Sequence, residues 1–494
     1  MSPMFTEDQY VINVTLNHRF NKESRKYQGH TIETAIKDLI DNHIDSGLKL
    51  NGNLTSNKIQ MFIADDLLKP GQKVLITTDF GYGMSADNLT NMYCDNYSTK
   101  KHDPDTNPNN KLGYLGRFGN GHKKACAYLS DGVVTLSMQQ DGQLHAIDYN
   151  RNNLNVQGAN PELPFYRIIR GKNLKTDAYL QYWMEYMRDE NGNFITHGTM
   201  NVLYDIDKEH LPKLIRCFKI DPHFNEKQFY YILGETYCKK INENLKIFIG
   251  SNYNNLSSVK PFDPFYDSKV VGEPKTFQMT QEVNGIKQTF PVKVTFHSFE
   301  QINNAHRPTG NSNGGFYIFR EGRLHLDPHG KPIPLTLTAS AIEFIENDPK
   351  LRSTRQDGEK KKSSDLIWPR TVGASGDFRC EIEYSAILDG KFNLDPNKTS
   401  IHLNESEVDF VVSLYRESRD ITRSETKKRD EQSKLKYQLP SVMISEQAKL
   451  SEKNLSFYED KGKEILDALV DDDVDVVKRA LNAYNENVGI KVTF

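Results

Sequence analysis

Three short polar side chains share one face of a predicted helix near the start of the chain. Asp38, Asn42 and Asp45 stand at i, i+4 and i+7, in a segment whose apolar residues also recur at helical spacing. Asp and Asn are poor residues for a helix interior, because their side chains compete for backbone hydrogen bonds. The pattern predicts a helix over Thr31 to Ser46, with either a solvated face or a site built from carboxylate and amide oxygens.

A second group of chemically useful residues follows a short apolar run. Val74 to Thr78 predicts a buried strand, and it leads directly into Asp79-Phe80-Gly81-Tyr82-Gly83-Met84. The two glycines allow positive φ angles or a close approach of the backbone to another group. Asp79 is placed at the carboxyl end of the strand, where layered α/β proteins bind ligands. Ordinary turn chemistry is the alternative explanation for the glycines.

A glycine-rich stretch then precedes a predicted helix over His122 to Leu129. Bare N–H groups at a helix N-terminus, with the positive end of the helix dipole, suit a phosphate group, and Lys123 would add a cation. The stretch is not a Walker A motif, because His122 follows Gly121 where that motif has lysine. A flexible linker is the alternative interpretation.

Composition and charge limit the classes of protein that fit. The chain has 494 residues and a net charge of −3, so we expect more than one domain and no general attraction to nucleic acid or anionic membrane. Its 5 cysteines are scattered without a CxxC pair, which argues against a zinc site and fits a reducing compartment. No signal peptide, transmembrane segment or membrane partner is expected.

The remaining pattern predicts an α+β protein in three parts. We expect a first α+β domain over residues 1–270, a second α/β domain over 271–415 and a charged helical region over 416–494. The expected elements are a strand at Tyr10–Leu16, a hairpin of Val133–Met138 and Leu144–Tyr149, a turn and strand at His197–Tyr204, strands at Phe290–Phe299, Gly315–Arg320 and Phe378–Tyr384, and helices at Ser340–Asn347 and Leu455–Asn485.

In order and spacing, these motifs resemble the GHKL ATPase superfamily, which includes gyrase, heat-shock chaperones, histidine kinases and MutL, and they are most similar to MORC-like proteins. The resemblance covers about Tyr10 to Ile401. It rests on Asp38/Asn42/Asp45, Asp79-Phe80-Gly81-Tyr82-Gly83, the stretch from Gly116 to Lys123, Gly198-Thr199, Gly315 to Leu324, and Asn397-Lys398-Thr399.

The resemblance implies a GHKL (Bergerat) α/β sandwich ATPase domain, an S5-like transducer domain and a helical tail, with ATP and Mg²⁺ as cofactors. By analogy, Asn42 ligates Mg²⁺, Asp79 accepts the adenine amino proton, Thr199 acts near adenine through water, and Lys398 stabilises charge on the transferred phosphoryl group. The other nucleotide contacts that the resemblance implies are Gly81, Gly83, Met84, Gly116, Gly119, Asn120, Gly121, His122 and Lys123.

One residue departs from the family pattern. The family's general base is usually Glu, and here the position is Asp38, which is shorter by one methylene, about 1.3–1.5 Å. A general base must lie within about 3 Å of its water. Two functions therefore stay open: an enzymatic ATP-dependent switch, and a scaffold that binds nucleotide but hydrolyses it slowly or not at all.

The resemblance also implies partners. The first hypothesis is an ATP-dependent homodimeric switch or clamp that acts on DNA or a partner protein, with a role in genome or antiviral defence. The second is a non-enzymatic, nucleotide-gated dimerisation scaffold. Both place the protein in the cytoplasm, or in the nucleus of a eukaryote.

Overall fold

The computed structural model describes a defined part of the chain, and the statements below concern that part. It describes residues 31–48, 58–85, 88–89, 92, 115, 121–139, 144–150, 166–171, 178–189, 191–219, 229–266, 268–283, 285–298, 315–326, 335–336, 343, 378–393, 401–403, 407–414, 416–418, 420–421, 424–425, 427–428 and 431. The strand predicted at Tyr10–Leu16 and the helix predicted at Leu455–Asn485 lie outside these residues, as does all of the Ser340–Asn347 helix except Glu343.

The chain divides into two compact units, Met1–Ile421 and Thr422–Phe494, and every element named here belongs to the first. Eight strands of the described residues form a mixed sheet in the order β5-β4-β3-β6-β2-β1-β7-β8. Within this sheet, β1 and β7 pair in parallel and the other described pairs are antiparallel. The strands are β1 (Lys58–Asp65), β2 (Lys73–Asp79), β3 (Ser130–Met138), β4 (Leu144–Asn150), β5 (Tyr166–Gly171), β6 (Gly198–Ile206), β7 (Lys246–Gly250) and β8 (Ser257–Ser258).

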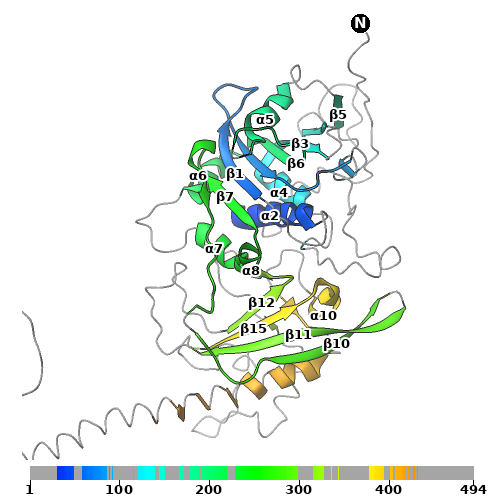
Figure 1. Ribbon diagram of the computed structural model, residues 1–494, viewed down its shortest axis with the longest axis vertical. Coiled ribbons are helices and arrows are strands. Elements are labelled where there is room, and N and C mark those ends of the chain that lie inside the picture. The colour runs from blue at the N-terminus through cyan, green and yellow to red at the C-terminus, as the bar shows by residue number, and fades with distance from the viewer. Residues whose placement is uncertain are drawn as a thin grey trace, which may run out of the picture. The chain divides into compact units, whose positions relative to one another are not determined.

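Helices cover both faces of this first sheet, because its strands bury apolar residues on both sides (Figure 1). In β1, Ile59, Met61 and Ile63 pack with the helices of one face, whereas Phe62 packs with Trp183 on the other. The first face carries α2 (Ile32–Leu48), α4 (Gly121–Leu129), α6 (His210–Phe218), α7 (Phe229–Thr236) and α8 (Cys238–Asn242); the second carries α5 (Ala178–Tyr186), and the short η2 (Tyr253–Asn255) follows β7.

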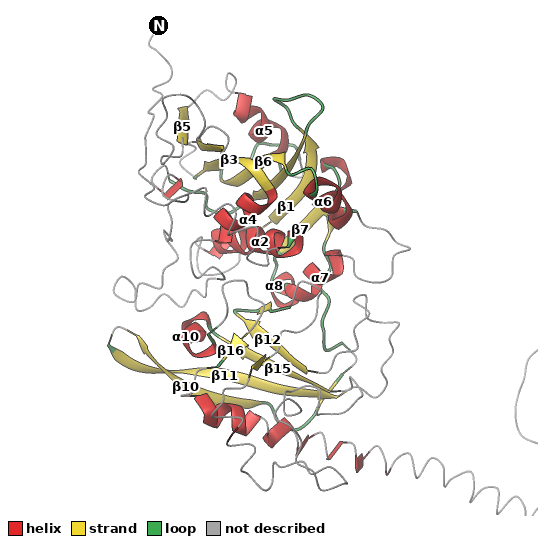
Figure 2. Ribbon diagram, turned by 180° about the vertical axis from the view of Figure 1, so that it is seen from behind, coloured by secondary structure: helices red, strands yellow, loops and turns green. Residues whose placement is uncertain are grey.

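A second sheet follows along the chain, in the order β10-β11-β15-β12-β13, with β9 also paired to β11 (Figure 2). β12 and β15 are parallel, and the other pairs are antiparallel. The elements are β9 (Lys269–Val270), β10 (Lys275–Val283), β11 (Ile286–Ser298), β12 (Gly315–Arg320), β13 (Arg323–Leu324), β15 (Phe378–Tyr384), η5 (Ala386–Leu388) and α10 (Asp389–Phe392), beside a small parallel pair of β14 (Leu335–Thr336) and β16 (Ile401–His402).

Strand β12 contributes to two apolar cores. Tyr317 and Phe319 belong to the core beneath the helices of the first sheet, whereas Phe316 and Ile318 belong to the core of the second sheet. Alternate side chains of one strand point to opposite faces, so this strand joins the two cores. The helical residues 408–414 add Phe410, which packs edge-on against Phe277 of β10 with ring centroids 5.1 Å apart.

Helices and mixed sheets in these two arrangements agree with the expected α+β class. The predicted helix at Thr31–Ser46, the strand at Val74–Thr78, the helix at His122–Leu129, the hairpin and the strand at Gly315–Arg320 are confirmed to within two residues at each end, apart from the earlier start of β3. Of the helices the structure describes, none combines the length and apolar character needed to cross a membrane.

Candidate functional site

Asp79 ends β2 in the middle of the first sheet, opposite Thr199 of β6. Its buried carboxylate receives three hydrogen bonds. His43 Nδ1 lies 2.6 Å from Oδ2, and the Ser46 hydroxyl and the Gly81 N–H each lie 2.9 Å from Oδ1. Each carboxylate oxygen has about two acceptor positions. The described contacts therefore fill Oδ1 and leave one position on Oδ2.

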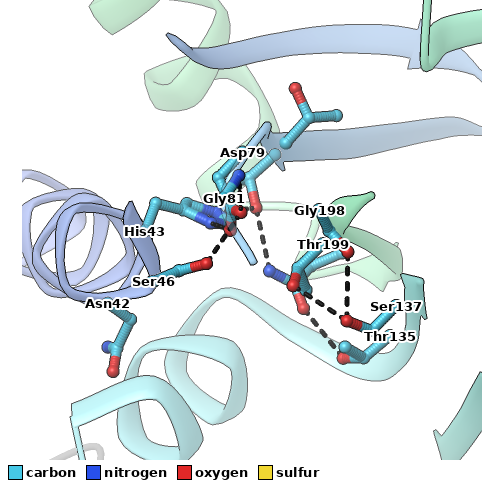
Figure 3. A network of polar contacts seen from close by, with 12 residues as sticks. Asn42, His43, Ser46, Asp79, Gly81, Thr135, Ser137, Gly198 and Thr199 are labelled. Carbon is cyan, nitrogen blue, oxygen red and sulfur yellow. Dashed lines mark hydrogen bonds and ion pairs between the residues drawn. The ribbon is translucent and has the colours of Figure 1, made fainter. Parts of the chain in front are cut away.

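His43 connects Asp79 to a row of buried polar side chains across the sheet (Figure 3). Thr135 Oγ1 donates to Asn201 Oδ1 over 2.8 Å, and Asn201 Nδ2 donates to Thr77 Oγ1 over 3.1 Å. Thr77 Oγ1 lies 2.8 Å from His43 Nε2. Because the Asp79 carboxylate can only accept, His43 Nδ1–H donates to it; in this tautomer Nε2 accepts the Thr77 hydroxyl proton, and Thr77 accepts from Asn201. The row thus supports this imidazole tautomer and delivers a donor to the carboxylate.

The turn after Asp79 contacts the rest of the fold at both glycines. A Cβ on Gly81 would overlap the Ser46 hydroxyl, and a Cβ on Gly83, which has φ of +76°, would overlap the carbonyl oxygen of Met138. The Met84 N–H then donates to Ser137 Oγ over 2.8 Å. The double-glycine motif therefore allows the turn to lie directly against α2 and β3.

Thr199 lies beside this turn at the start of β6. Its hydroxyl is 3.0 Å from Ser137 Oγ, which in turn donates to the Gly198 carbonyl over 3.1 Å. The Ser137 proton is used by Gly198, so Thr199 donates to Ser137 and keeps its acceptor lone pairs. His197 Nδ1 lies 2.8 Å from the Gly81 carbonyl and ties the same turn to β6.

An earlier part of α2 faces the start of α4. A Cβ built on Gly121, the first residue of α4, would lie 3.7 Å from Asp38 Cγ and 3.8 Å from Asn42 Nδ2. In Figure 3, Asn42 points away from Asp79 while His43 and Ser46 lie toward it. The Asn42 Nδ2 donates to the Asp38 carbonyl over 2.6 Å, which places its amide oxygen away from that carbonyl.

The three residues of the predicted polar face separate into two environments. Asp38 is 8% exposed and lies near Gly121, whereas Asp45 is 0% exposed and accepts the Leu115 N–H over 2.8 Å. A solvated face is therefore the wrong interpretation for these two carboxylates. Asp45 instead holds the chain immediately before Gly116.

The first turn of α4 places His122 and Lys123 in buried positions, and His122 Nε2 lies 3.4 Å from Cys126 Sγ. No group of three or more His, Cys, Asp or Glu side chains suited to a metal occurs within the described ranges. Near the start of α4 lie the Asp38 carboxylate and the Asn42 side-chain amide, and each group carries oxygen that can bind a cation. Such oxygen donors fit Mg²⁺, which binds through one or two protein groups together with substrate phosphates.

The structure thus brings together most of the sequence-predicted site. Asp79, Gly81, Gly83, Met84 and Thr199 lie around one end of β2, and the α2–α4 contact involves Asn42 and Asp38, one and two helical turns before Ser46. The α2–α4 contact gathers Asp38, Asn42, Gly121, His122 and Lys123. Gly116, Gly119, Asn120 and Lys398 lie outside the described residues.

Sequence reasoning missed the residues that hold Asp79. His43 follows Leu39 by four residues and Ile40 by three, so it lies on the apolar stripe of α2, and a buried histidine needs a polar partner. That signal was present in the sequence. The sequence contains no such signal for Thr77 and Asn201, because their contact depends on the pairing of β2 with β6.

Residues 30–174 match the family model described as histidine kinase-, DNA gyrase B-, and HSP90-like ATPase. The match covers α2, β2 with its following turn, and α4, whereas the site residues at the start of β6, Thr199 among them, lie beyond it. It supports the GHKL ATPase superfamily for this segment and suggests ATP binding. No curated protein sequence matches the chain.

Proposed function

We propose that the protein binds ATP with Mg²⁺ and hydrolyses it, with adenine at Asp79 and the phosphates at the start of α4. The observation that carries this proposal is the carboxylate of Asp79. It is buried at a strand end, held by three donors, and left with one acceptor position on Oδ2. An exocyclic amino group of a base is a hydrogen-bond donor that can bind to this acceptor position.

The adenine end of the site follows from these contacts. The amino group of adenine donates to Asp79 Oδ2, and the backbone of Gly81, Gly83 and Met84 lies along the base. Thr199, whose own proton is directed to Ser137, accepts a hydrogen bond from a water beside the ring. A guanine carbonyl at the same position would face the carboxylate without a proton, so the site favours adenine.

The phosphate end uses the edge between α2 and α4. The N-terminus of α4 at Gly121 and His122 offers N–H groups and a positive dipole end, and Lys123 adds a charge. The Asn42 amide oxygen would hold Mg²⁺, which would neutralise phosphate charge when bound. Asp38 orients and deprotonates the attacking water, and Gly116, Gly119, Asn120 and Lys398 complete the set expected from the sequence.

At the level of the whole protein, we infer an ATP-dependent homodimeric switch or clamp of MORC-like type, with the second sheet as an S5-like transducer. ATP binding biases a two-state element, and hydrolysis resets it. DNA or a partner protein is the substrate, in genome or antiviral defence, in the cytoplasm or in a nucleus. The family match and the second sheet beside the ATPase-like segment support this inference.

A second candidate function is a nucleotide-gated dimerisation scaffold with little or no hydrolysis. The observation that favours it is Asp38, the shorter carboxylate at the position of the general base, on a helix whose orientation is fixed by buried contacts. Adenine and Mg²⁺ binding would be the same in both candidates. Only turnover and reopening of the dimer differ.

The test is a set of measurements with Mg-ATP. Wild type is expected to bind ADP and ATP, to release phosphate, and to form a dimer with a non-hydrolysable ATP analogue. Asn42→Ala should abolish Mg²⁺-dependent binding or turnover while its melting temperature stays close to wild type. Asn191→Ala, in an exposed loop, serves as the matched control.

Normal Mg-ATP binding and turnover by Asn42→Ala would contradict the metal assignment. Wild type that binds Mg-ATP and dimerises without phosphate release would select the scaffold.

A further inference from the structure

Two buried arginines project from the hairpin that joins β12 and β13. Arg320 and Arg323 face each other as a cross-strand pair, and they are 2% and 4% exposed. The turn between them contains Glu321, with φ of +50°, and its carboxylate Oε1 accepts the Ser385 hydroxyl and the Ala386 N–H, both over 2.7 Å. The hairpin is therefore fixed to the end of β15 in the second sheet.

Arg323 reaches the helix that carries the proposed catalytic residues. Its Nε donates to Asp41 Oδ1 over 2.8 Å, and the Tyr237 hydroxyl lies 2.7 Å from the same oxygen. Burial, and then the charge of Asp41, raise the pKa of Tyr237 well above its usual range, so the hydroxyl stays protonated and donates. Asp41 precedes Asn42 and lies one helical turn after Asp38.

Arg320 holds the chain that leads toward α4. Its Nε and Nη2 each lie 2.6 Å from a different oxygen of Asp389, and its Nη1 donates to the Leu115 carbonyl over 2.8 Å. The N–H of Leu115 donates to Asp45 of α2 over 2.8 Å. One residue, Leu115, is thus bonded to α2 through its N–H and to the second sheet through its carbonyl.

These two connections act on the same helix. Asp41 and Asp45 are one turn apart in α2, so Arg323 holds the helix directly and Arg320 holds it through Leu115. Arginine suits this task, because its planar fork keeps several donors in fixed directions at once. A displacement of the hairpin would move Asp38 and Asn42 relative to the start of α4.

We propose that Arg320 and Arg323 are positioning residues of the nucleotide site, through which the second sheet sets the alignment of α2 with α4. This inference rests on the proposed function. It predicts that loss of either arginine impairs turnover more than ground-state nucleotide affinity, because hydrolysis requires tighter alignment than binding.

The first test is Arg320→Lys. An ammonium can pair with Asp389 but cannot also present a fixed donor to the Leu115 carbonyl, so the buried charge pair is kept and the connection is lost. We expect kcat to fall by about 10- to 100-fold, the scale of a misalignment of about 1 Å, with ADP affinity little changed. In the absence of nucleotide, amide exchange at Leu115 should become faster.

The matched control is Lys239→Gln. Lys239 of α8 pairs with Glu381 and Glu383 of β15 at 2.7 and 3.0 Å, so it also connects the two sheets but touches neither Leu115 nor Asp41 in the described contacts. It should keep wild-type kcat and wild-type exchange at Leu115. An equal loss of kcat in Lys239→Gln and Arg320→Lys would overturn the proposal in favour of general loosening.

A second variant pair guards against misfolding of Arg320→Lys. Asp41→Asn and Arg323→Gln each remove one charge of a buried ion pair and should lower kcat, whereas the double variant restores a neutral hydrogen-bonded pair and should recover much of it. If Arg320→Lys keeps the kcat of wild type and its amide exchange rate at Leu115, or if the double variant shows no recovery of kcat, the positioning role is wrong while the proposed function still stands. Wild type that does not bind ATP overturns the proposed function and this inference with it.

Discussion

His43 stands between the polar row of the sheet and Asp79. Thr77 donates to its Nε2, and its Nδ1–H orients the carboxylate that we propose to recognise adenine. A carboxylate that has lost one of three fixed donors can rotate and present its lone pairs differently. Base selectivity should therefore depend on His43 even though the residue is placed behind Asp79 rather than against the nucleotide.

The variant His43→Gln should weaken ADP binding by about 1–3 kcal/mol, the cost of an imperfect hydrogen bond to a charged group. It should also reduce the ratio of ADP to GDP affinity, measured by isothermal titration. His297→Gln, at a buried histidine of the second sheet, is the control for loss of a packed imidazole. An equal loss of affinity for both nucleotides would show that His43 has no part in base selection.

Asp38 tests whether the site is catalytic. If it is a working base, Asp38→Ala should lower turnover by about 10²–10⁴-fold. Asp38 is buried beside Gly121, so a longer side chain would extend toward the start of α4 and displace the water. We therefore expect Asp38→Glu to be slower than wild type at unchanged ATP affinity. If Asp38→Glu hydrolyses ATP clearly faster than wild type, the native Asp38 is too short to act as a base, and this result would favour the scaffold.

At the scale of elements, periodicity was sufficient for the helices and strands that carry the site. The apolar stripe of α2, the buried run of β2 and the glycine boundary of α4 are all local signals. Strand β1 was missed because it buries nearly every residue, including Gln60, and so shows no alternation of apolar and polar residues. Strand β10 does alternate between exposed and less exposed residues, whereas the first four residues of β11 are exposed on both faces and show no alternation.

Long-range pairing set the limit of prediction for the site. Asp38, Asn42 and Asp79 came from motifs, but Arg323 contacts Asp41 across 282 positions and Arg320 contacts Leu115 across 205. No local spacing encodes such pairs, since they depend on how two sheets pack. The sequence therefore indicated the ligand-facing residues better than the residues that hold them.

The contact of α8 with β15 has a defined pH dependence. Burial alone would raise the pKa of Glu381, but the hydrogen bond from His297 and the charge of Lys239 outweigh it and lower that pKa from its ordinary 4.5. Burial would lower the pKa of Lys239, and Glu381 and Glu383 reverse this and raise it above 10.5. The stabilisation from Glu381 is complete above pH 4.5 and is lost as the pH falls through its lowered pKa.

Lys239→Gln should therefore lower the free energy of unfolding by about 1 kcal/mol near neutral pH. The effect is small because solvent screens a partly exposed ion pair. The difference from wild type should shrink as the pH falls below 4.5 and as it rises beyond 10.5, where the lysine loses its proton. Urea titrations across this range measure it. A difference that is constant with pH would mean that the charges contribute nothing.

At the scale of the whole molecule, the first sheet and the second are linked through apolar packing and through charge. Strand β12 places Tyr317 and Phe319 in one core and Phe316 and Ile318 in the other. In the hairpin that joins β12 to β13, Arg323 contacts α2. Rigid, shared elements of this kind can carry a change at one site to a distant sheet. A nucleotide-driven switch requires such a link, and all of it depends first on nucleotide binding at Asp79.

The most direct test of that claim is isothermal titration of wild type and Asp79→Asn with Mg-ADP. We predict that wild type binds and that Asp79→Asn binds more weakly by about 1–3 kcal/mol, because the amide cannot present the same charged acceptor to adenine. Asp189→Asn, at an exposed loop carboxylate, should match wild type. Equal affinity of wild type and Asp79→Asn for Mg-ADP, or no binding by wild type, would contradict the account.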